Sequence, residues 1–263
     1  MITLKDQLGH LIKLNSKPKR IISLVPSQTE FLFDLGLDKE VVGITKFCIH
    51  PQQWFKTKTR VGGTKTLNFD KIKSLKPDLI IANKEENTQS EIEYLLKNYT
   101  VYVSDISTLN EAYQMMNHIA QLTQKVKEGQ KIIAEIKQNF KDLPQFNIKA
   151  LYMIWRSPYM VAGRQTFINH LLNQIDIKNC ISDKKSRYIE VNDKVIAESD
   201  LDYIFLSSEP YPFKNKHIEE LKKISKAKPI LVDGEIFSWY GSRLKHFKKY
   251  VTEVLSYNIS KSN

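Results

Sequence analysis

Aromatic side chains in polar segments are the feature of this sequence best suited to bind a ligand. Six of them follow predicted strands: Phe47, Trp155, Tyr159, Tyr188, Trp239 and Tyr240. Trp155 and the pair Trp239-Tyr240 stand beside Ser, Arg, Gly and Pro rather than inside apolar runs, which favours the wall of a pocket for a large, flat ligand. Ordinary core packing is the alternative. The neighbouring Arg156, Arg187 and Arg243 are suited to hold carboxylate, phosphate or amide groups of such a ligand.

Signatures of catalysis and of phosphate binding are absent from the sequence. It contains no P-loop, no Gly-x-Gly-x-x-Gly and no Gly-x-Ser-x-Gly. Cys48 and His50 are placed to ligate a metal from one side of an extended segment, but two ligands are too few for a closed zinc site. The alternative is a buried thiol beside a loop histidine. With Cys180, Cys48 makes at most one disulfide, which nothing in the sequence requires. We therefore expect no catalytic residue and no metal held by the protein itself.

Two short acidic segments occupy corresponding places in the two halves of the chain. Glu85 and Glu86 form the first, and Glu209 stands in the second, where two prolines stiffen the backbone. Glu85 follows Asp78 by seven positions, and Glu209 follows Asp202 by seven. The segments are either solvated loops or acidic knobs that dock on basic sockets of a partner.

The overall charge is basic, with 40 Lys and Arg against 29 Asp and Glu and a net charge of +11. Because lysines alternate with glutamates and apolar residues, this charge favours solvated helix faces over a nucleic-acid surface. No run approaches the 18 apolar residues of a membrane helix. The first residues, MITLKD, do not begin a signal peptide, so either the protein is cytoplasmic or a leader lies outside this sequence.

Strands and helices alternate along the chain, which predicts parallel α/β sheets. Residues 2–14 predict a hairpin, and Ser27 and Glu30 predict a capping box at the first helix. Strands are expected at residues 20–25, 41–45, 78–83, 100–105, 149–155, 202–207 and 229–233. The segment 108–140 is helical, as one helix or as two that break near Thr123. We expect a first α/β lobe at residues 1–122, a linker helix at 123–143 and a second lobe at 144–263. Ligands of open α/β sheets bind at the carboxyl ends of the strands.

Four segments resemble the class III periplasmic binding proteins, also called helical-backbone metal receptors, and in particular the branch that binds vitamin B12. These segments are residues 20–30 (RIISLVPSQTE), 43–51 (GITKFCIHP), 75–82 (LKPDLIIA) and 231–243 (LVDGEIFSWYGSR). The resemblance runs in order from residue 2 to about residue 255. It implies two similar α/β lobes joined by one long helix, with the ligand in a cleft between them.

The resemblance also assigns roles to residues of this sequence. The aromatic wall falls on Phe47, Trp155 and Trp239, with Tyr188 as a further candidate. Family members dock one glutamate from each lobe on a membrane permease, and here these glutamates fall on Glu209 and on one of Glu85, Glu86 and Glu91. Thr64 stands where the B12 binder has an aromatic ring.

The sequence therefore predicts a monomeric solute-binding protein of an ABC importer, without enzymatic activity or a built-in cofactor, that acts in the periplasm or at the cell surface. It captures cobalamin, another corrinoid or a related metal chelate. The alternative ligand is a ferric siderophore or haem, with iron ligation by Tyr159, Tyr188 or His50. An alternative of another class is a cytoplasmic enzyme or chaperone that handles a corrinoid or a metal. In the first hypothesis, Trp239→Ala weakens ligand binding with little loss of stability.

Overall fold

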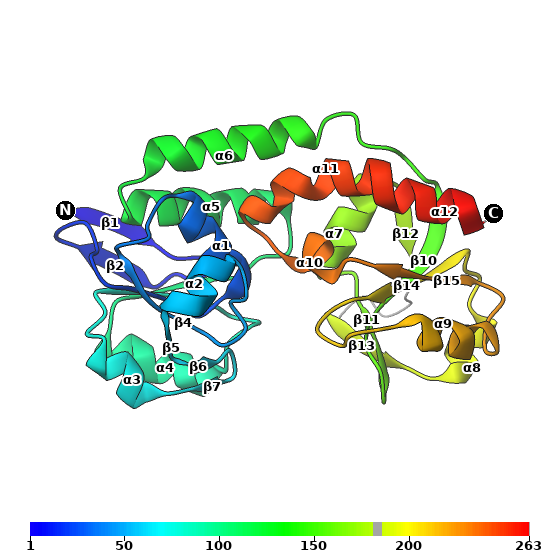
Figure 1. Ribbon diagram of the computed structural model, residues 1–263, viewed down its shortest axis with the longest axis horizontal. Coiled ribbons are helices and arrows are strands. Elements are labelled where there is room, and N and C mark those ends of the chain that lie inside the picture. The colour runs from blue at the N-terminus through cyan, green and yellow to red at the C-terminus, as the bar shows by residue number, and fades with distance from the viewer. Residues whose placement is uncertain (181–185, 263) are drawn as a thin grey trace. The chain divides into compact units, whose positions relative to one another are not determined.

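Two units, each built on its own sheet, make up the structure, which is a computed structural model that describes residues 1–180 and 186–262 (Figure 1). The first unit comprises Met1–Ile106, Asn110–Ile136 and Tyr240–Arg243, and the second comprises Ser107–Leu109, Lys137–Trp239 and Leu244–Asn263. The units divide after Ile136, inside the segment 123–143 that the sequence predicts as a linker.

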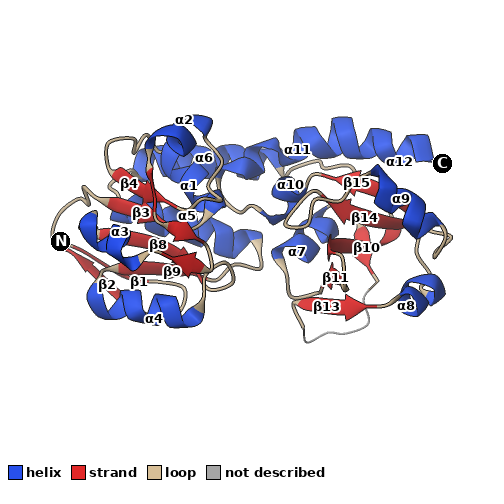
Figure 2. Cartoon of the chain, turned by 60° about the horizontal axis from the view of Figure 1, so that its bottom comes forward, coloured by secondary structure: helices blue, strands red, loops and turns tan. Residues whose placement is uncertain are grey.

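The first unit contains a five-stranded parallel sheet with the strand order β5-β4-β3-β8-β9. Figure 2 shows the arrowheads of β4, β3, β8 and β9 pointing the same way. These strands are short buried runs, as expected where helices cover both faces of a sheet. Their bounds are β3 (Ile21–Ser23), β4 (Val41–Ile44), β5 (Thr59–Arg60), β8 (Leu79–Asn83) and β9 (Val101–Ser104). Two antiparallel hairpins accompany the sheet: β1 (Ile2–Lys5) with β2 (Leu11–Leu14), which was expected, and β6 (Gly62–Gly63) with β7 (Thr66–Leu67).

The first helix begins two residues earlier than the capping box predicts. Val25 is the N-cap of α1 (Pro26–Asp34), and Ser27 lies inside the helix, so the expected cap is wrong. Proline suits this first position because its missing N–H has no helical partner to lose. The other helices of this part are α2 (Gln52–Thr57), α3 (Phe69–Ser74) and α4 (Gln89–Asn98).

The helical segment in the middle of the chain is two helices, which settles the question that the sequence leaves open. These are α5 (Leu109–Leu122) and α6 (Val126–Asn139). The turn between the two helices contains Gln124, whose φ of 55° lies in the left-handed region. The turn brings α6 back against α5. A Cβ on Gly129 of α6 would lie 2.6 Å from the Cβ of Ala120 on α5, so their close contact depends on glycine. The last three residues of α6 belong to the second unit.

The second unit has a mixed sheet with the strand order β13-β11-β10-β14-β15, and β12 also pairs with β10. Its parallel part joins β10 to β12 and β14, and β14 to β15. Two antiparallel strands, β11 and β13, were not expected from the sequence. The bounds are β10 (Ile148–Trp155), β11 (Tyr159–Ala162), β12 (Ile177–Asn179), β13 (Tyr188–Val191), β14 (Tyr203–Ser207) and β15 (Lys228–Val232). The α/β fold with parallel sheets is thus confirmed in both units.

The helices of the second unit are short, and one continuous helical segment ends the chain. They are α7 (Phe167–Gln174), α8 (Asp193–Glu198), α9 (Asn215–Lys222) and α10 (Gly234–Ser238). The final segment consists of a 3-10 turn (Ser242–His246), α11 (Phe247–Tyr250), a π-helical turn (Val251–Leu255) and α12 (Ser256–Ser262).

The two units repeat one local arrangement around their central strands. The backbone N–H of Asp78 donates to the carbonyl oxygen of Arg20, and the Asp78 carboxylate accepts from the Arg20 N–H. Asp202 exchanges the same two hydrogen bonds with Lys149. Because both pairs join the starts of neighbouring parallel strands, the matching positions of these aspartates in the sequence reflect matching structure.

Candidate ligand-binding site

The carboxyl edge of the first sheet presents an exposed aromatic ring. Phe47 follows β4 and is 51% exposed, which is unusual for so large an apolar side chain. The Lys46 ammonium lies 5.1 Å from the centre of the ring. A flat, solvent-facing ring at this edge is suited to pack against a planar ligand.

A buried thiol holds the loop that carries Phe47. The Cys48 side chain is fully buried, and its sulfur lies 3.1 Å from the Thr29 hydroxyl and 3.2 Å from the Thr45 hydroxyl. Burial raises the pKa of this thiol, so it stays protonated and is a poor metal ligand. Within the described residues, no three His, Cys, Asp or Glu side chains gather closely enough to hold a metal ion. Both cysteines are free.

We expect Cys48 to be labelled by a maleimide only when the protein unfolds, because the thiol is both inaccessible and protonated. Cys180 is half-buried and provides the internal comparison. Mass spectrometry of peptides after timed labelling measures both sites. Fast labelling of Cys48 in the native protein would show that the loop opens freely.

A network of buried amides shapes the next loop along this edge. The Asn83 side-chain oxygen accepts from the backbone N–H groups of Glu85 and Glu86 and so turns the chain sharply after β8. The Asn87 amide donates to the carbonyl oxygen of Thr64, which is itself buried. Glu91 accepts from the backbone N–H of Leu67, which gives it a structural role, and Glu85 and Glu86 are both half-buried.

The carboxyl edge of the second sheet also presents an exposed ring. Trp155 ends β10 and is 40% exposed, and one edge of it meets Tyr211, with 5.7 Å between ring centres. Tyr211 follows β14, the strand next to β10, and its N–H donates to the carbonyl oxygen of Ile154. The adjacency of these parallel strands therefore places the two rings together.

A neutral histidine supports this pair of rings. The Lys214 backbone N–H donates to Nδ1 of His217, so the ring proton is on Nε2, which lies 3.2 Å from the Tyr211 hydroxyl. Burial lowers the pKa of His217, which keeps the ring neutral. Sequence reasoning missed Tyr211 and His217, although the aromatic and proline-rich run 210–213 was a signal.

Arg156 is engaged by neighbours in its own unit. Its guanidinium lies 2.8 Å from a carboxylate oxygen of Glu220. Burial lowers its pKa, but the hydrogen bond with Tyr159 and the charge of Glu220 outweigh that effect, and the pKa is raised. Tyr159 lies on β11 and Tyr188 on the adjacent β13, and both are half-buried.

Glu209 and Trp239 are joined by a hydrogen bond, which the sequence did not indicate. The Glu209 carboxylate accepts from Nε1 of Trp239 at 2.8 Å and from the Ser238 hydroxyl at 2.7 Å. Burial raises the pKa of Glu209, and these two hydrogen bonds partly oppose the rise. The Trp239 ring is only 6% exposed, so its substitution is expected to cost stability, contrary to the expectation from sequence.

Tyr240 and Arg243 belong to the first unit. Tyr240 is buried, at 6% exposure. The Arg243 guanidinium donates to both carboxylate oxygens of Glu30, at 3.0 and 2.8 Å. This bidentate ion pair fastens the segment 240–243 to α1. Glu30, which the sequence assigned to a capping box, is used here instead.

A family model described as "Periplasmic binding protein" matches residues 21–226, which include Phe47, Trp155 and Glu209 and all but one of the strands of the two larger sheets. The chain belongs to the periplasmic binding protein family. The resemblance recognised in the sequence is thereby confirmed. Members of this family are non-enzymatic binding components of ABC importers.

Three relatives show how this binding protein compares with known chains. It is 28% identical over 217 residues to an uncharacterised ABC transporter substrate-binding lipoprotein of Bacillus subtilis, which covers 77% of this chain and 68% of the relative. It is 27% identical over 195 residues to the vitamin B12-binding protein of Vibrio cholerae, which covers 72% and 70%. A solved structure of a possible iron-binding, periplasmic solute-binding protein from Staphylococcus epidermidis matches with a TM-score of 0.74 and 28% identity, over 89% of this chain and 97% of that chain.

The predicted ligand residues of this binding protein differ in how they are presented. Phe47 and Trp155 expose their rings, whereas Trp239 and Tyr240 are buried. His50, Tyr159 and Tyr188 are half-buried. In the described part of the chain, no helix is long and apolar enough to cross a membrane.

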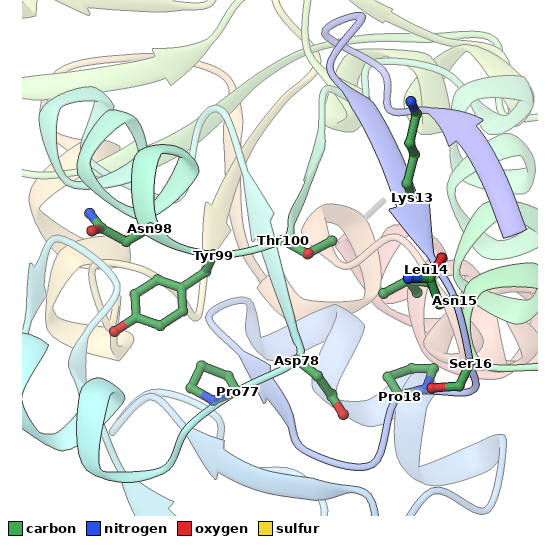
Figure 3. Close-up of a pocket in the computed structure, with 10 residues that line it drawn as sticks. All are labelled: Lys13, Leu14, Asn15, Ser16, Pro18, Pro77, Asp78, Asn98, Tyr99 and Thr100. Carbon is green, nitrogen blue, oxygen red and sulfur yellow. The ribbon is translucent and has the colours of Figure 1, made fainter. Parts of the chain in front are cut away.

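A hollow of about 350 Å³ lies at the opposite, amino-terminal edge of the first sheet of the binding protein. Figure 3 shows Asn98 and Tyr99 at one side of it, Ser16 and Pro18 at the other, and Asp78 between them. The Asp78 carboxylate accepts from the N–H groups of Lys19 and Arg20, so its charge holds the chain before β3 in place. The carboxylate in this hollow therefore has a structural role at the amino-terminal edge of the sheet.

Proposed function

We propose that the protein captures cobalamin, another corrinoid or a related metal chelate and delivers it to an ABC permease. The observation that carries this proposal is the exposure of Phe47 and Trp155, one at the carboxyl edge of each sheet. Each ring is exposed in a segment that its neighbours hold: Cys48 anchors the loop of Phe47 in the first unit, and Tyr211 with His217 supports Trp155 in the second. Preformed apolar surfaces bind a planar chelate more tightly, because no free energy is lost in ordering the loops on binding.

The chelate itself would supply all the metal ligands. The described residues contain no cluster of metal-ligating side chains, and the one thiol at this edge is buried and protonated. The similarity to the vitamin B12-binding protein of Vibrio cholerae supports a corrinoid. As in its relatives, we place the protein outside the cytoplasmic membrane, in the periplasm or as a lipoprotein.

Calorimetric titration of the purified protein with cyanocobalamin tests the proposal directly. We expect saturable one-to-one binding with a dissociation constant of about 1 μM or lower. Haem and a ferric siderophore are titrated in parallel. Absence of binding by all three would contradict the role as a chelate-binding protein.

An iron chelate is the second candidate ligand. The possible iron-binding protein from Staphylococcus epidermidis is 28% identical to this chain, and the match covers 97% of that protein. Tyr159, Tyr188 and His50 are the side chains that would approach such a ligand. Binding of the siderophore or haem without binding of cobalamin would select this alternative.

We infer that the acidic loops after β8 and β14 dock on the permease. Glu85 and Glu209 stand at equivalent places, two residues beyond the ends of matching strands, and each N–H donates to the side chain of the strand's last residue. The charge of Glu209 is separable from its structural role, because glutamine also offers an oxygen to Trp239 and Ser238.

Glu209→Gln is therefore expected to leave ligand affinity within about twofold while uptake falls, because only the charge is removed. Glu209→Ala should also cost about 1–3 kcal/mol of stability, because it leaves the buried Nε1–H of Trp239 without an acceptor. Glu190→Gln, at an exposed position on β13, is the matched control for the change of charge. Ligand titration, urea unfolding and an uptake assay measure the three properties. Normal uptake with Glu209→Gln would exclude this glutamate from docking.

A further inference from the structure

The short hairpin of β6 and β7, residues 62–67, follows β5 at the carboxyl edge of the first sheet. It is joined directly to the loop that carries the exposed ring of Phe47. The backbone N–H of Lys46, the residue before Phe47, donates to the carbonyl oxygen of Gly62 at 2.8 Å. The hairpin and the ring therefore belong to one local structure, although 15 positions separate Phe47 from Gly62 in the sequence.

The Phe47 ring occupies space that a side chain on Gly63 would need. A Cβ on Gly63 would lie 3.3 Å from Cε2 of Phe47 and 3.3 Å from Cε of Lys46. It would also lie 2.8 Å from the hydroxyl oxygen of Thr66, which is too close for an unmoved structure. The φ of Gly63 is outside the left-handed region, so the close approach, and not the backbone conformation, is what calls for glycine here.

The hairpin itself is held by side chains from the segment after β8. The Asn87 amide, which is buried, donates to the carbonyl oxygen of Thr64 at 2.9 Å. Glu91, in the first turn of α4, accepts from the backbone N–H of Leu67 at 2.8 Å. Because these two bonds reach the turn and the second strand of the hairpin, they fix where Gly63 lies.

The contact with Gly63 complements the anchor at Cys48. The buried thiol holds the backbone of the loop, but a half-exposed ring is still able to change its rotamer. A neighbour that fills one side of the ring restricts that freedom. A ring that is already oriented loses less conformational entropy when a ligand covers it.

We propose that the hairpin 62–67 orients the Phe47 ring for the ligand, with Gly63 and Glu91 as positioning residues that do not touch the ligand. The proposal rests on the proposed function, in which Phe47 is part of the ligand surface. It gives Glu91 a task inside the first unit in place of the docking role that the sequence considered.

The first test is a double-mutant cycle on ligand affinity. Gly63→Val adds bulk beside the ring, and Glu91→Ala removes the acceptor that holds the hairpin. Each is titrated with cyanocobalamin, haem and a ferric siderophore, in the natural sequence and together with Phe47→Ala. Glu91→Gln keeps an acceptor oxygen, and Glu93→Ala removes an exposed carboxylate from the same helix, so these two serve as controls.

We expect Gly63→Val and Glu91→Ala each to weaken binding of the chelate by about fivefold or more, and both controls to change it less than about twofold. In the Phe47→Ala background, Gly63→Val and Glu91→Ala should change affinity less than about twofold, because the ring through which they act is gone. A loss of stability alone would not produce this dependence on Phe47. Urea unfolding of each variant verifies that it is folded at the temperature of the titration.

The second test observes the ring without any ligand. The protein is prepared with para-trifluoromethylphenylalanine in place of Phe47, so that fluorine NMR reports on this one side chain. Gly63→Val and Glu91→Ala should shift or broaden its signal, whereas Glu91→Gln and Glu93→Ala should leave it unchanged.

Two results would overturn the positioning role. One is an unchanged fluorine signal in folded Gly63→Val and Glu91→Ala. The other is a loss of affinity that is equally large with and without the Phe47 ring. Absence of binding by all three chelates would instead contradict the proposed function, and the fluorine signal would still decide whether the hairpin orients the ring.

Discussion

Trp155→Ala is expected to weaken binding of the transported chelate by about ten- to a hundredfold, because it removes an aromatic surface that the ligand would cover. The ring is 40% exposed and touches Tyr211 at one edge only, so the free energy of unfolding should fall by about 1 kcal/mol or less. Calorimetric titration and urea unfolding of the same preparation measure the two effects.

Two variants control this experiment. Trp155→Phe keeps a flat ring and should recover most of the affinity. Tyr257→Ala removes another exposed ring of the second unit, on α12, and should leave affinity unchanged. If Trp155→Ala binds the chelate as tightly as the natural sequence, Trp155 is not part of the ligand surface.

In contrast to Trp155→Ala, Trp239→Ala should mainly reduce stability and lower the free energy of unfolding by about 3–5 kcal/mol. The ring is 6% exposed, and its Nε1–H donates to the carboxylate of the half-buried Glu209. Alanine would leave a cavity and deprive that carboxylate of a donor. Urea unfolding followed by circular dichroism measures the loss, since the method does not rely on tryptophan fluorescence.

Trp239→Phe separates the two contributions, because it keeps most of the ring and removes only the hydrogen bond. We expect it to cost about 1–3 kcal/mol, less than the alanine substitution. A stable Trp239→Ala variant with greatly reduced chelate affinity would instead show that the ring is a ligand wall, as the sequence suggested.

The contrast between Trp155 and Trp239 shows that the sequence does not predict which of two similar aromatic residues is exposed. Both stand in polar segments after strands, and local composition favoured the same role for both. Their exposure differs because Trp239 has Glu209 as an acceptor, 30 positions away, whereas Trp155 ends its strand beside Tyr211. Such contacts depend on which strands are neighbours, and composition does not encode the strand order.

Several local features were predictable because their causes are local. Apolar runs such as β8, bounded by Pro77 and polar loops, predicted the buried strands. The matching offsets of Asp78 and Asp202 indicated the repeated arrangement that both units show. The antiparallel strands β11 and β13 were missed because each is only four residues long and half of the residues in each are partly buried, so neither has the pattern of a core strand.

By itself, the sequence determined the alternation of strands and helices, the segments at the carboxyl ends of the strands and the family to which the chain belongs. These follow from the pattern of neighbouring residues, which sets backbone conformation and burial within one element. Only the tertiary structure decided which charges and rings remain available. Arg243 pairs with Glu30 across 213 positions, and Trp239 pairs with Glu209 across 30, whereas Phe47 and Trp155 keep exposed rings. The availability of a side chain depends on its neighbours in space, which only the folded chain brings together.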